Sequence, residues 1–501
     1  MRPVLPAALL ATCLGLTACA STPATGAAPA GSSAPSSSGP TSSTAPITTA
    51  PAPPAPTPTS AAPAPTSAAP APPAPPGARA EWTTYHGDLG RTGYAPGSPD
   101  PVNPRLAWTA QLDGAAYASP LVIGGLVVQA TAGGSVYGLD AATGAVRWRT
   151  HVADPVPGDR LPCGNIDPLG ITGTPAYDAA TGQVFAVAAQ AGPQVVVHVL
   201  YGIDARTGAI RSHRPVDAPG SEPATQLQRA ALAVSGGQVV IAYGGNYGDC
   251  GAYLGRIVAV RTDGTGPLRA FAVPTRREAG IWAASGPAAL PDGSLLVTTG
   301  NGEATGGAWD HSDSVLRLTP ALEIADGFAP AEWAQENSVD ADLGSTGPVV
   351  LPGGGQVVAA GKGGSVYLLD AAHLGGVGGQ RSVLRGCRSY GGAAVLPGPG
   401  GAAVLLPCTE GLTQVLVGPD GLTRGWRAPT QVTGSPVVGG STVWSLQSDG
   451  ALYGLDAQTG AVRANLQVGD ATRFATPALA GGSLFVGTRR GVTAVALAPP
   501  G

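Results

Sequence analysis

The feature that most constrains the fold is a phrase that the chain repeats. The pattern Tyr-Gly-Leu/Ile-Asp-Ala-x-Thr-Gly-Ala-Val/Ile-Arg occurs within residues 136–148, 200–211 and 452–463. Such internal repetition indicates a repeat architecture. Each copy combines an alternating apolar strand, a tight turn and a second strand, because Asp140 and Thr143 can hydrogen-bond the turn backbone and Gly144 permits a positive φ. We interpret each copy as one hairpin of a propeller blade.

A second signal, a small residue usually followed by Pro, counts the blades. It marks the inner strand of six units, and two weaker units begin near Ala230 and Gly391. The six markers are Ser119-Pro120, Thr174-Pro175, Gly286-Pro287, Gly347-Pro348, Ser435-Pro436 and Thr476-Pro477. Eight units of roughly 40–60 residues suit four-stranded blades.

The predicted fold is therefore all-β, an eight-bladed β-propeller of four-stranded antiparallel blades; seven blades is the alternative count. A β-sandwich array fits poorly, because no linker separates the units. The last unit looks one strand short, and residues 105–112 can supply that strand and close the ring. Closure removes exposed sheet edges.

The N-terminus predicts export. Arg2 precedes an apolar run from Val4 to Leu16, which is too short to span a bilayer and is typical of a signal peptide. The run ends in Leu-Thr-Ala-Cys, similar to the bacterial lipobox, so Cys19 is the predicted lipidation site. An ordinary signal peptide with a chance cysteine is the alternative. We expect a protein anchored by lipid alone to the outer face of the cell membrane.

The next segment is rich in Ala, Pro, Ser and Thr and has no charged or aromatic residue between Ala20 and Ala78. Such a composition cannot bury a core, so we expect a disordered, extended tether. The predicted organisation is a lipoprotein signal peptide at 1–18, a linker at 19–80 and the propeller at 81–501.

Four cysteines remain after the signal and lipidation positions: Cys163, Cys250, Cys387 and Cys408. In an oxidising compartment they are expected to form structural disulfides. Three pairings are open, and proximity along the chain favours Cys387 with Cys408 and Cys163 with Cys250. A formal net charge of -4 without a basic run disfavours nucleic acid as a partner. We expect a monomer.

The repeated phrase and the opening residues 82–94 resemble the quinoprotein family, whose members include pyrroloquinoline quinone (PQQ) dehydrogenases. The resemblance extends over essentially everything from Trp82 onward. It implies the fold more strongly than catalysis, because the same repeat builds dehydrogenases, scaffold lipoproteins of outer-membrane assembly and propellers without activity. For the enzymes it implies PQQ with Ca²⁺ as Lewis acid, an Asp general base and a Lys or Arg on the quinone.

Several positions match the family in order. Asn301 lies where the enzymes have a Ca²⁺ ligand, and Asp340 or Asp342 where they have the catalytic Asp. Lys362 matches the residue that reaches the quinone, and Trp282 a ring that stacks on it. Lys362 is the sole lysine of the chain, which favours a specific need for an ammonium group there.

Each match has a structural alternative. Asn301 suits a left-handed turn, the two aspartates can cap a turn, Lys362 can occupy an exposed hairpin tip, and Trp282 can pack between blades. A cluster around His311 is a weaker metal candidate, and a solvated loop is its alternative.

Departures from the enzymes weigh against turnover. The chain has no adjacent Cys-Cys pair, no Cys-x-x-Cys-His haem motif and no evident Glu for the Ca²⁺ set in the early blades. Two functions remain. The first is an envelope binding or scaffold module, with a protein or small molecule as partner, that retains a PQQ-like pocket. The second is a PQQ-dependent alcohol or sugar dehydrogenase.

Overall fold

The computed structural model describes residues 81–192 and 195–498. The predicted signal peptide, the predicted linker and Cys19 lie outside these residues. No helix within the described ranges is long and apolar enough to cross a membrane.

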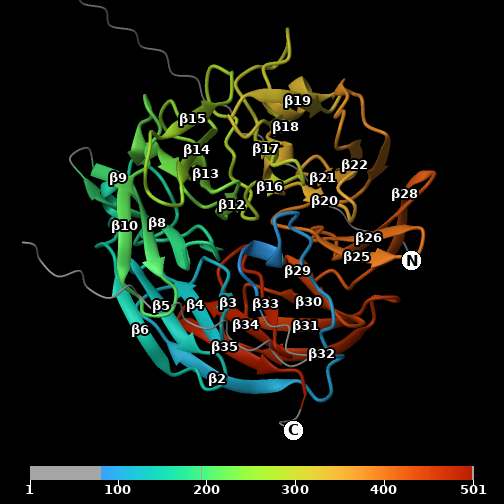
Figure 1. Ribbon diagram of the computed structural model, residues 1–501. Helices are drawn as coiled ribbons and strands as arrows, with labels where there is room; N and C mark the ends of the chain where they lie inside the picture. Colours follow the sequence, from blue (N-terminus) through green and yellow to red (C-terminus); the bar gives the residue numbers. More distant parts are fainter. Residues whose placement is uncertain (1–80, 193–194, 499–501) are drawn as a thin grey trace, which may run out of the picture. The chain divides into compact units, whose positions relative to one another are not determined.

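Eight small antiparallel sheets form the blades of a β-propeller, as the sequence predicts (Figure 1). The first four blades contain β3 (Leu121–Ile123), β4 (Leu126–Ala130), β5 (Ser135–Asp140) and β6 (Val146–His151); β7 (Ala176–Asp178), β8 (Gln183–Gly192), β9 (Val195–Asp204) and β10 (Ile210–Pro215); β12 (Ala233–Ser235), β13 (Gln238–Gly245), β14 (Arg256–Arg261) and β15 (Arg269–Ala272); β16 (Ala288–Ala289), β17 (Leu295–Thr299), β18 (Ser314–Leu318) and β19 (Ile324–Ala329).

The other four blades contain β20 (Val349–Val350), β21 (Gln356–Ala360), β22 (Ser365–Asp370) and β24 (Ser382–Arg385); β25 (Ala394–Gly398), β26 (Gly401–Leu406), β27 (Thr413–Gly418) and β28 (Gly421–Arg427); β29 (Pro436–Gly439), β30 (Thr442–Leu446), β31 (Ala451–Asp456) and β32 (Val462–Gln467); β33 (Ala478–Ala480), β34 (Ser483–Thr488), β35 (Gly491–Ala496) and β2 (Arg105–Gln111). Three short strands extend individual blades: β1 (Tyr94–Ala95), β11 (Gln226–Leu227) and β23 (Gly376–Val377).

The ring closes as predicted, because β2 pairs with β35 in antiparallel register. The weaker units begin at β12 and β25, which confirms eight blades. The described helical elements are short: η1 (Tyr85–Gly87), η2 (Gly158–Arg160), η3 (Pro223–Thr225), η4 (Leu343–Ser345) and α1 (Trp333–Ser338).

The hydrophobic core is divided among the spaces between neighbouring blades. Val128 of β4 and Ala186 of β8 share one buried cluster, and Leu296 of β17 and Val357 of β21 share another. Each blade face is therefore covered by the next blade, and closure of the ring covers the last face.

The repeated phrase forms the hairpin between the third and fourth strands of a blade. In the first copy Asp140 Oδ1 accepts from the backbone N–H and hydroxyl of Thr143, both at 2.9 Å, and Gly144 has φ +73°. An added Cβ at Gly144 would lie 2.5 Å from the ring of Trp108, which belongs to the preceding blade. The turn therefore requires glycine for both its backbone angle and the close approach of that ring.

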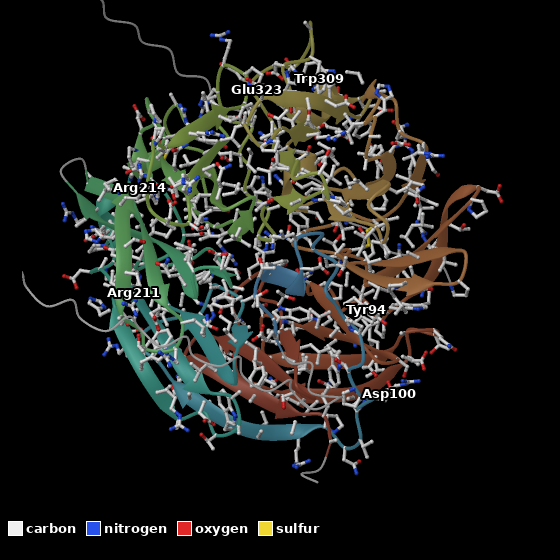
Figure 2. All side chains as sticks on the ribbon, in the orientation of Figure 1. Tyr94, Asp100, Arg211, Arg214, Trp309 and Glu323 are labelled. Atoms are coloured by element: carbon white, nitrogen blue, oxygen red, sulfur yellow. A yellow bond between two sulfur atoms is a disulfide. The ribbon has the colours of Figure 1, made fainter. Side chains whose placement is uncertain are left out.

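Trp108 also donates its indole N–H to the carbonyl of Ala141 at 3.0 Å. Trp148 and Trp426 repeat this contact with the next blades. The phrase is therefore a docking surface between blades as well as a turn. Its arginine points outward: Figure 2 shows Arg211 at the outer edge of the ring, where it bonds Asp204 at 2.7 Å.

The segment from Trp82 to Tyr94, here called the axial plug, lies near the centre of the ring and contains η1 (Figure 1, blue). It bonds every blade in turn around the axis. Its backbone or side-chain partners are Val122, Tyr177, Leu232, Ala289, Val350, Val395, Val438 and Thr476.

Two buried polar residues anchor the axial plug. Arg91 donates to the carbonyls of Pro287, Tyr85 and Leu232 and to the Thr84 hydroxyl at 2.7–3.2 Å. His86 Nδ1 lies 2.9 Å from the carbonyl oxygen of Ala393. Burial lowers the pKa of His86 to about 3, so its ring is neutral in the folded protein.

Candidate functional site

A cavity of about 630 Å³ lies on the propeller axis. Its wall is built from loops that precede the inner strands of different blades, including Tyr117 before β3, Arg229 before β12 and Trp282 before β16. The axial plug bonds positions further along these inner strands, such as Val122 and Ala289. The plug therefore occupies the part of the axis beyond the cavity.

Lys362 and two aspartates form the centre of one wall. Lys362 Nζ lies 2.5 Å from Asp340 Oδ1 and 2.8 Å from Asp342 Oδ2, and it stands 5.3 Å from the centroid of the Trp282 ring. The side chain of Lys362 is 15% exposed, so it is not an exposed hairpin tip. The fold thus brings together residues from three separate loops that the sequence comparison with the family had singled out.

The turn that carries Lys362 is fixed by close packing. An added Cβ at Gly361 would lie 2.3 Å from the carbonyl oxygen of Asp342, and the Lys362 N–H donates to that same oxygen at 2.9 Å. Only glycine allows this approach between the two loops. The backbone therefore sets where the ammonium group can reach.

The two aspartates differ in exposure. The Asp340 side chain is 68% exposed and lines the cavity, whereas the Asp342 carboxylate is fully buried. Burial raises the pKa of Asp342, although Lys362 opposes that shift. Burial also disfavours the charged form of Lys362, but the two carboxylates outweigh it and raise the pKa of Lys362. The ammonium group therefore stays charged at neutral pH.

Asn301 lies between carboxylates on two sides. One of its side-chain atoms faces Asp342 Oδ2 at 3.3 Å and Asp340 Oδ1 at 3.2 Å, and Glu278 Oε2 lies 3.4 Å from the other. Burial raises the pKa of Glu278, with nearby acids adding to the effect. Asn301 does not adopt a positive φ, so the left-handed-turn alternative does not hold.

The oxygen atoms of Asp340 and Asp342 that face Asn301 can gain a partner in two ways. With its amide nitrogen toward Asp340 and Asp342, Asn301 donates a hydrogen bond to each carboxylate. With its amide oxygen toward them, three oxygens converge and require a cation. The donor set is thus of the type that Ca²⁺ prefers, and Asp342 Oδ1 is buried without a hydrogen-bond partner among the described atoms.

Backbone strain concentrates around the cavity. Three lining residues have a positive φ without being glycine: Asp249 (+49°), Asp340 (+54°) and Phe474 (+68°). Glu278 and Ala279, next to Asn301, do so as well. The preference for strained backbone at binding sites gives independent support to this location.

The cavity lining also contains arginines and aromatic rings that the sequence analysis missed. Arg473 stands 5.2 Å from the Tyr390 ring centroid and 4.8 Å from that of Phe474, and Arg229 stands 5.6 Å from that of Tyr117. A usable signal existed, because these residues come just before the small-residue markers of their blades. These residues come from different blades and meet only when the propeller ring closes, so their proximity cannot be deduced from their order in the chain.

One disulfide lies beside the cavity. Cys163 and Cys250 are bonded, with 6.1 Å between their Cα atoms. The same two loops contribute Ile166 and Tyr247 to the cavity wall. The second disulfide, Cys387–Cys408, is buried between blades. Both pairings agree with the favoured expectation, and such bonds are typical of proteins outside the cytoplasm.

The weaker candidate around His311 does not form a ligand set. His311 stacks on Trp309 with ring centroids 4.4 Å apart, and Asp310 accepts hydrogen bonds from Thr275 and Ser312. Nowhere in residues 81–192 and 195–498 do three His, Cys, Asp or Glu side chains group as metal ligands.

Comparisons with known proteins agree with this architecture. A family profile described as outer membrane protein assembly factor BamB matches residues 100–314, which is less than half of the chain. A search of curated protein sequences finds no significant match.

Three solved structures illustrate the likeness. A quinohemoprotein alcohol dehydrogenase from Pseudomonas putida HK5 has 16% identity and a TM-score of 0.63, covering 84% of this chain and 82% of that one. A europium-containing methanol dehydrogenase has 16% identity and a TM-score of 0.61, covering 82% and 90%. BamB from Moraxella catarrhalis has 17% identity and a TM-score of 0.54, covering 78% and 99%.

At these identities the likeness shows the fold alone. The fold and the profile match are those of a PQQ-repeat β-propeller, as the repeated phrase predicts.

Proposed function

We propose that this chain is an extracytoplasmic binding module of the cell envelope whose axial cavity takes up PQQ, or a closely related quinone, together with Ca²⁺. The observation that carries the proposal is the convergence of Lys362, Asp340, Asn301 and Trp282 on one wall of the cavity, with Asp342 buried behind Lys362. The choice of a quinone as ligand is supported by the dehydrogenases among the structural neighbours.

Each residue has a role that its position supports. Lys362 would donate hydrogen bonds to the quinone oxygens, and Asp342, buried behind it, holds the ammonium in place. Trp282 offers its ring face to a planar ligand. The amide oxygen of Asn301 and the carboxylate of Asp340 are the groups that would hold Ca²⁺, which when bound polarises a carbonyl as a Lewis acid.

The test is a titration of the purified protein with PQQ, with and without Ca²⁺, read by quenching of tryptophan fluorescence. We expect saturable quenching that Lys362→Ala weakens at least tenfold and that Ca²⁺ strengthens in the wild type. Arg211→Ala, which removes an exposed partner of Asp204 at the outer edge of the ring, serves as the matched control. Trp282→Phe is the second variant. Absence of saturable quenching in the wild type would contradict the proposal.

A dehydrogenase is the second candidate, and one observation favours it. The Asp340 carboxylate is exposed to the cavity and paired with Lys362, so an alcohol could reach it, whereas Asp342 is inaccessible. General-base action would therefore fall to Asp340. Dye-linked oxidation of alcohols and sugars by the PQQ- and Ca²⁺-loaded protein tests this role. Turnover that Asp340→Asn abolishes without loss of PQQ binding would establish it.

The envelope location rests on the disulfides, the profile match and the N-terminal pattern. Lipidation at Cys19 has its own test. Cys19→Ala should move the protein from the membrane fraction to the soluble fraction, and retention in the membrane fraction would refute the lipid anchor. Envelope proteins recovered by crosslinking to the wild type would identify a scaffold partner.

A further inference from the structure

Arg229 is a buried cation that lacks a counter-ion. The residue is 7% exposed, yet it lines the axial cavity. Its guanidinium donates to the carbonyls of Thr172 and Arg473, at 3.3 and 3.1 Å. The described residues place no carboxylate in an ion pair with it, and the charged or ionisable groups that act on it are Tyr85 and Tyr117.

This arrangement is costly for the protein alone. A buried charge is normally paired, because desolvation outweighs what two carbonyls return. Burial accordingly lowers the pKa of Arg229 to about 10. The same desolvation would make an anion beside it bind strongly.

Arg91 shows what a structural arginine looks like in the same molecule. It is 1% exposed, and its guanidinium makes four hydrogen bonds, to three carbonyls and one hydroxyl. Arg91 does not line the cavity. Arg229 has half as many protein partners and faces open space, so its remaining donors are available to a ligand.

Arg473 extends the positive wall and links it to aromatic rings. Its guanidinium lies over Tyr390 and Phe474, and Phe474 in turn contacts Trp282, with ring centroids 6.3 Å apart. A third arginine, Arg489, also lines the cavity. Cations and ring faces thus form a continuous belt from the Lys362 wall to the Arg229 wall.

We propose that Arg229 and Arg473 form a carboxylate-binding subsite, and that the cavity selects conjugated ligands with a carboxylate that reaches these arginines. The flat guanidinium groups match a carboxylate in two-point geometry, and the adjoining rings match the conjugated body. The inference rests on the proposed function in that it concerns the same cavity and fixes the orientation of its ligand.

The experiment compares three probes on the full chain: PQQ, naphthalene-2,6-dicarboxylate and the dimethyl ester of the latter. Binding is measured by calorimetry for the wild type, Arg229→Gln, Arg473→Gln and the control Arg211→Gln at the outer edge of the ring. We expect both acids to bind the wild type and each cavity variant to weaken them at least tenfold. The uncharged ester should bind poorly to every variant. The melting temperature of each ligand-free variant verifies folding, and Arg473→Gln stands in if Arg229→Gln fails to fold.

The outcomes separate the subsite from the proposed function. If PQQ binds equally well to the wild type and to both cavity variants, the proposed function stands and the subsite is overturned. If only the dicarboxylate binds, and loses affinity in Arg229→Gln, the subsite stands and the PQQ proposal fails. If neither acid binds the wild type, both are overturned.

Discussion

Two buried arginines mark two levels of the propeller axis, and their surroundings differ. In the axial plug, Arg91 makes four hydrogen bonds, two to carbonyls of neighbouring blades and two within the plug. In the cavity, Arg229 has two carbonyl partners and open space. Full satisfaction of polar groups is typical of a structural element, whereas an unpaired buried charge is tolerated where a ligand completes it. The same residue type thus has four hydrogen-bond partners at one level, and two partners and an open cavity at the other.

The largest expected effect is acid destabilisation of the axial plug. The folded pKa of His86 is about 3, below its ordinary value of 6.5, so the unfolded chain binds a proton first as pH falls. The stability that this group contributes is present above pH 6.5 and lost progressively toward pH 3, by on the order of 5 kcal/mol. Urea unfolding across this range should show the loss, and His86→Gln should flatten it.

Two buried carboxyls outside the axial plug act in the opposite sense: Asp342, which pairs with Lys362, and Asp313, which accepts from the Leu343 N–H at 2.7 Å. Asp342 and Asp313 have raised pKa values, chiefly from burial, so the folded state holds their protons more tightly than the unfolded state. Their contribution is present below the ordinary Asp range and lost as pH rises. If His86→Gln lost as much stability between pH 6.5 and pH 3 as the wild type, the acid destabilisation would not come from His86 in the axial plug.

Two of the loops beside the cavity are held together by a disulfide bond. Replacing Cys163 and Cys250 by Ser removes a crosslink with a sequence separation of 87, and chain-entropy reasoning gives a loss of about 4.6 kcal/mol. The matched pair Cys387 and Cys408, with a separation of 21, should cost about 3 kcal/mol. Only the first double variant should also weaken ligand binding in the cavity, because its loops contribute to the wall. If both double variants bound the ligand equally well, the Cys163–Cys250 disulfide would not contribute to ligand binding.

Arg91→Met tests the satisfied arginine. Losing four hydrogen bonds leaves buried carbonyls of three residues unpaired, so the free energy of unfolding should fall by about 3 kcal/mol. Chemical denaturation measures the change, and Arg211→Met, at an exposed arginine on the outer edge of the ring, is the control. A fall no larger than that of the control would show that the plug is not held by this residue.

The smallest effect is expected for Arg229→Met without ligand. Replacing an unpaired buried charge by an apolar side chain should leave stability within about 1 kcal/mol of the wild type, or raise it. A thermal unfolding scan decides between the two arginines. If Arg229→Met destabilised the protein as much as Arg91→Met, Arg229 would be structural and the contrast between the two levels would disappear.

Much of this molecule follows from local sequence. The phrase around Asp140 and Gly144 predicts its own turn, because the hydrogen bonds that form it lie within the phrase. Its repetition, with the small-residue markers, predicts the blades and their number. The ring closure by β2 also follows, since a missing strand in a repeat has to come from elsewhere in the chain.

The site was predictable only in part. Asn301, Asp340, Asp342, Lys362 and Trp282 were found through their resemblance to the quinoprotein pattern, and the structure places all but Asp342 in the cavity wall. The roles assigned to them remain predictions. Arg229 and Arg473 carry no motif, and the axial plug has no repeat, so neither was expected.

The sequence by itself determined the repeat, the hairpins, the number of blades and the preference among cysteine pairings, because these depend on residues near one another in the chain or on their order. Only the tertiary structure decided what meets on the axis. Closing the ring brings together Arg229, Lys362 and Arg473 from different blades, buries Asp342, and gives Arg229 two hydrogen bonds where Arg91 has four. Burial and pairing are properties of three-dimensional neighbours, and they set both the charge and the ligand preference of the cavity.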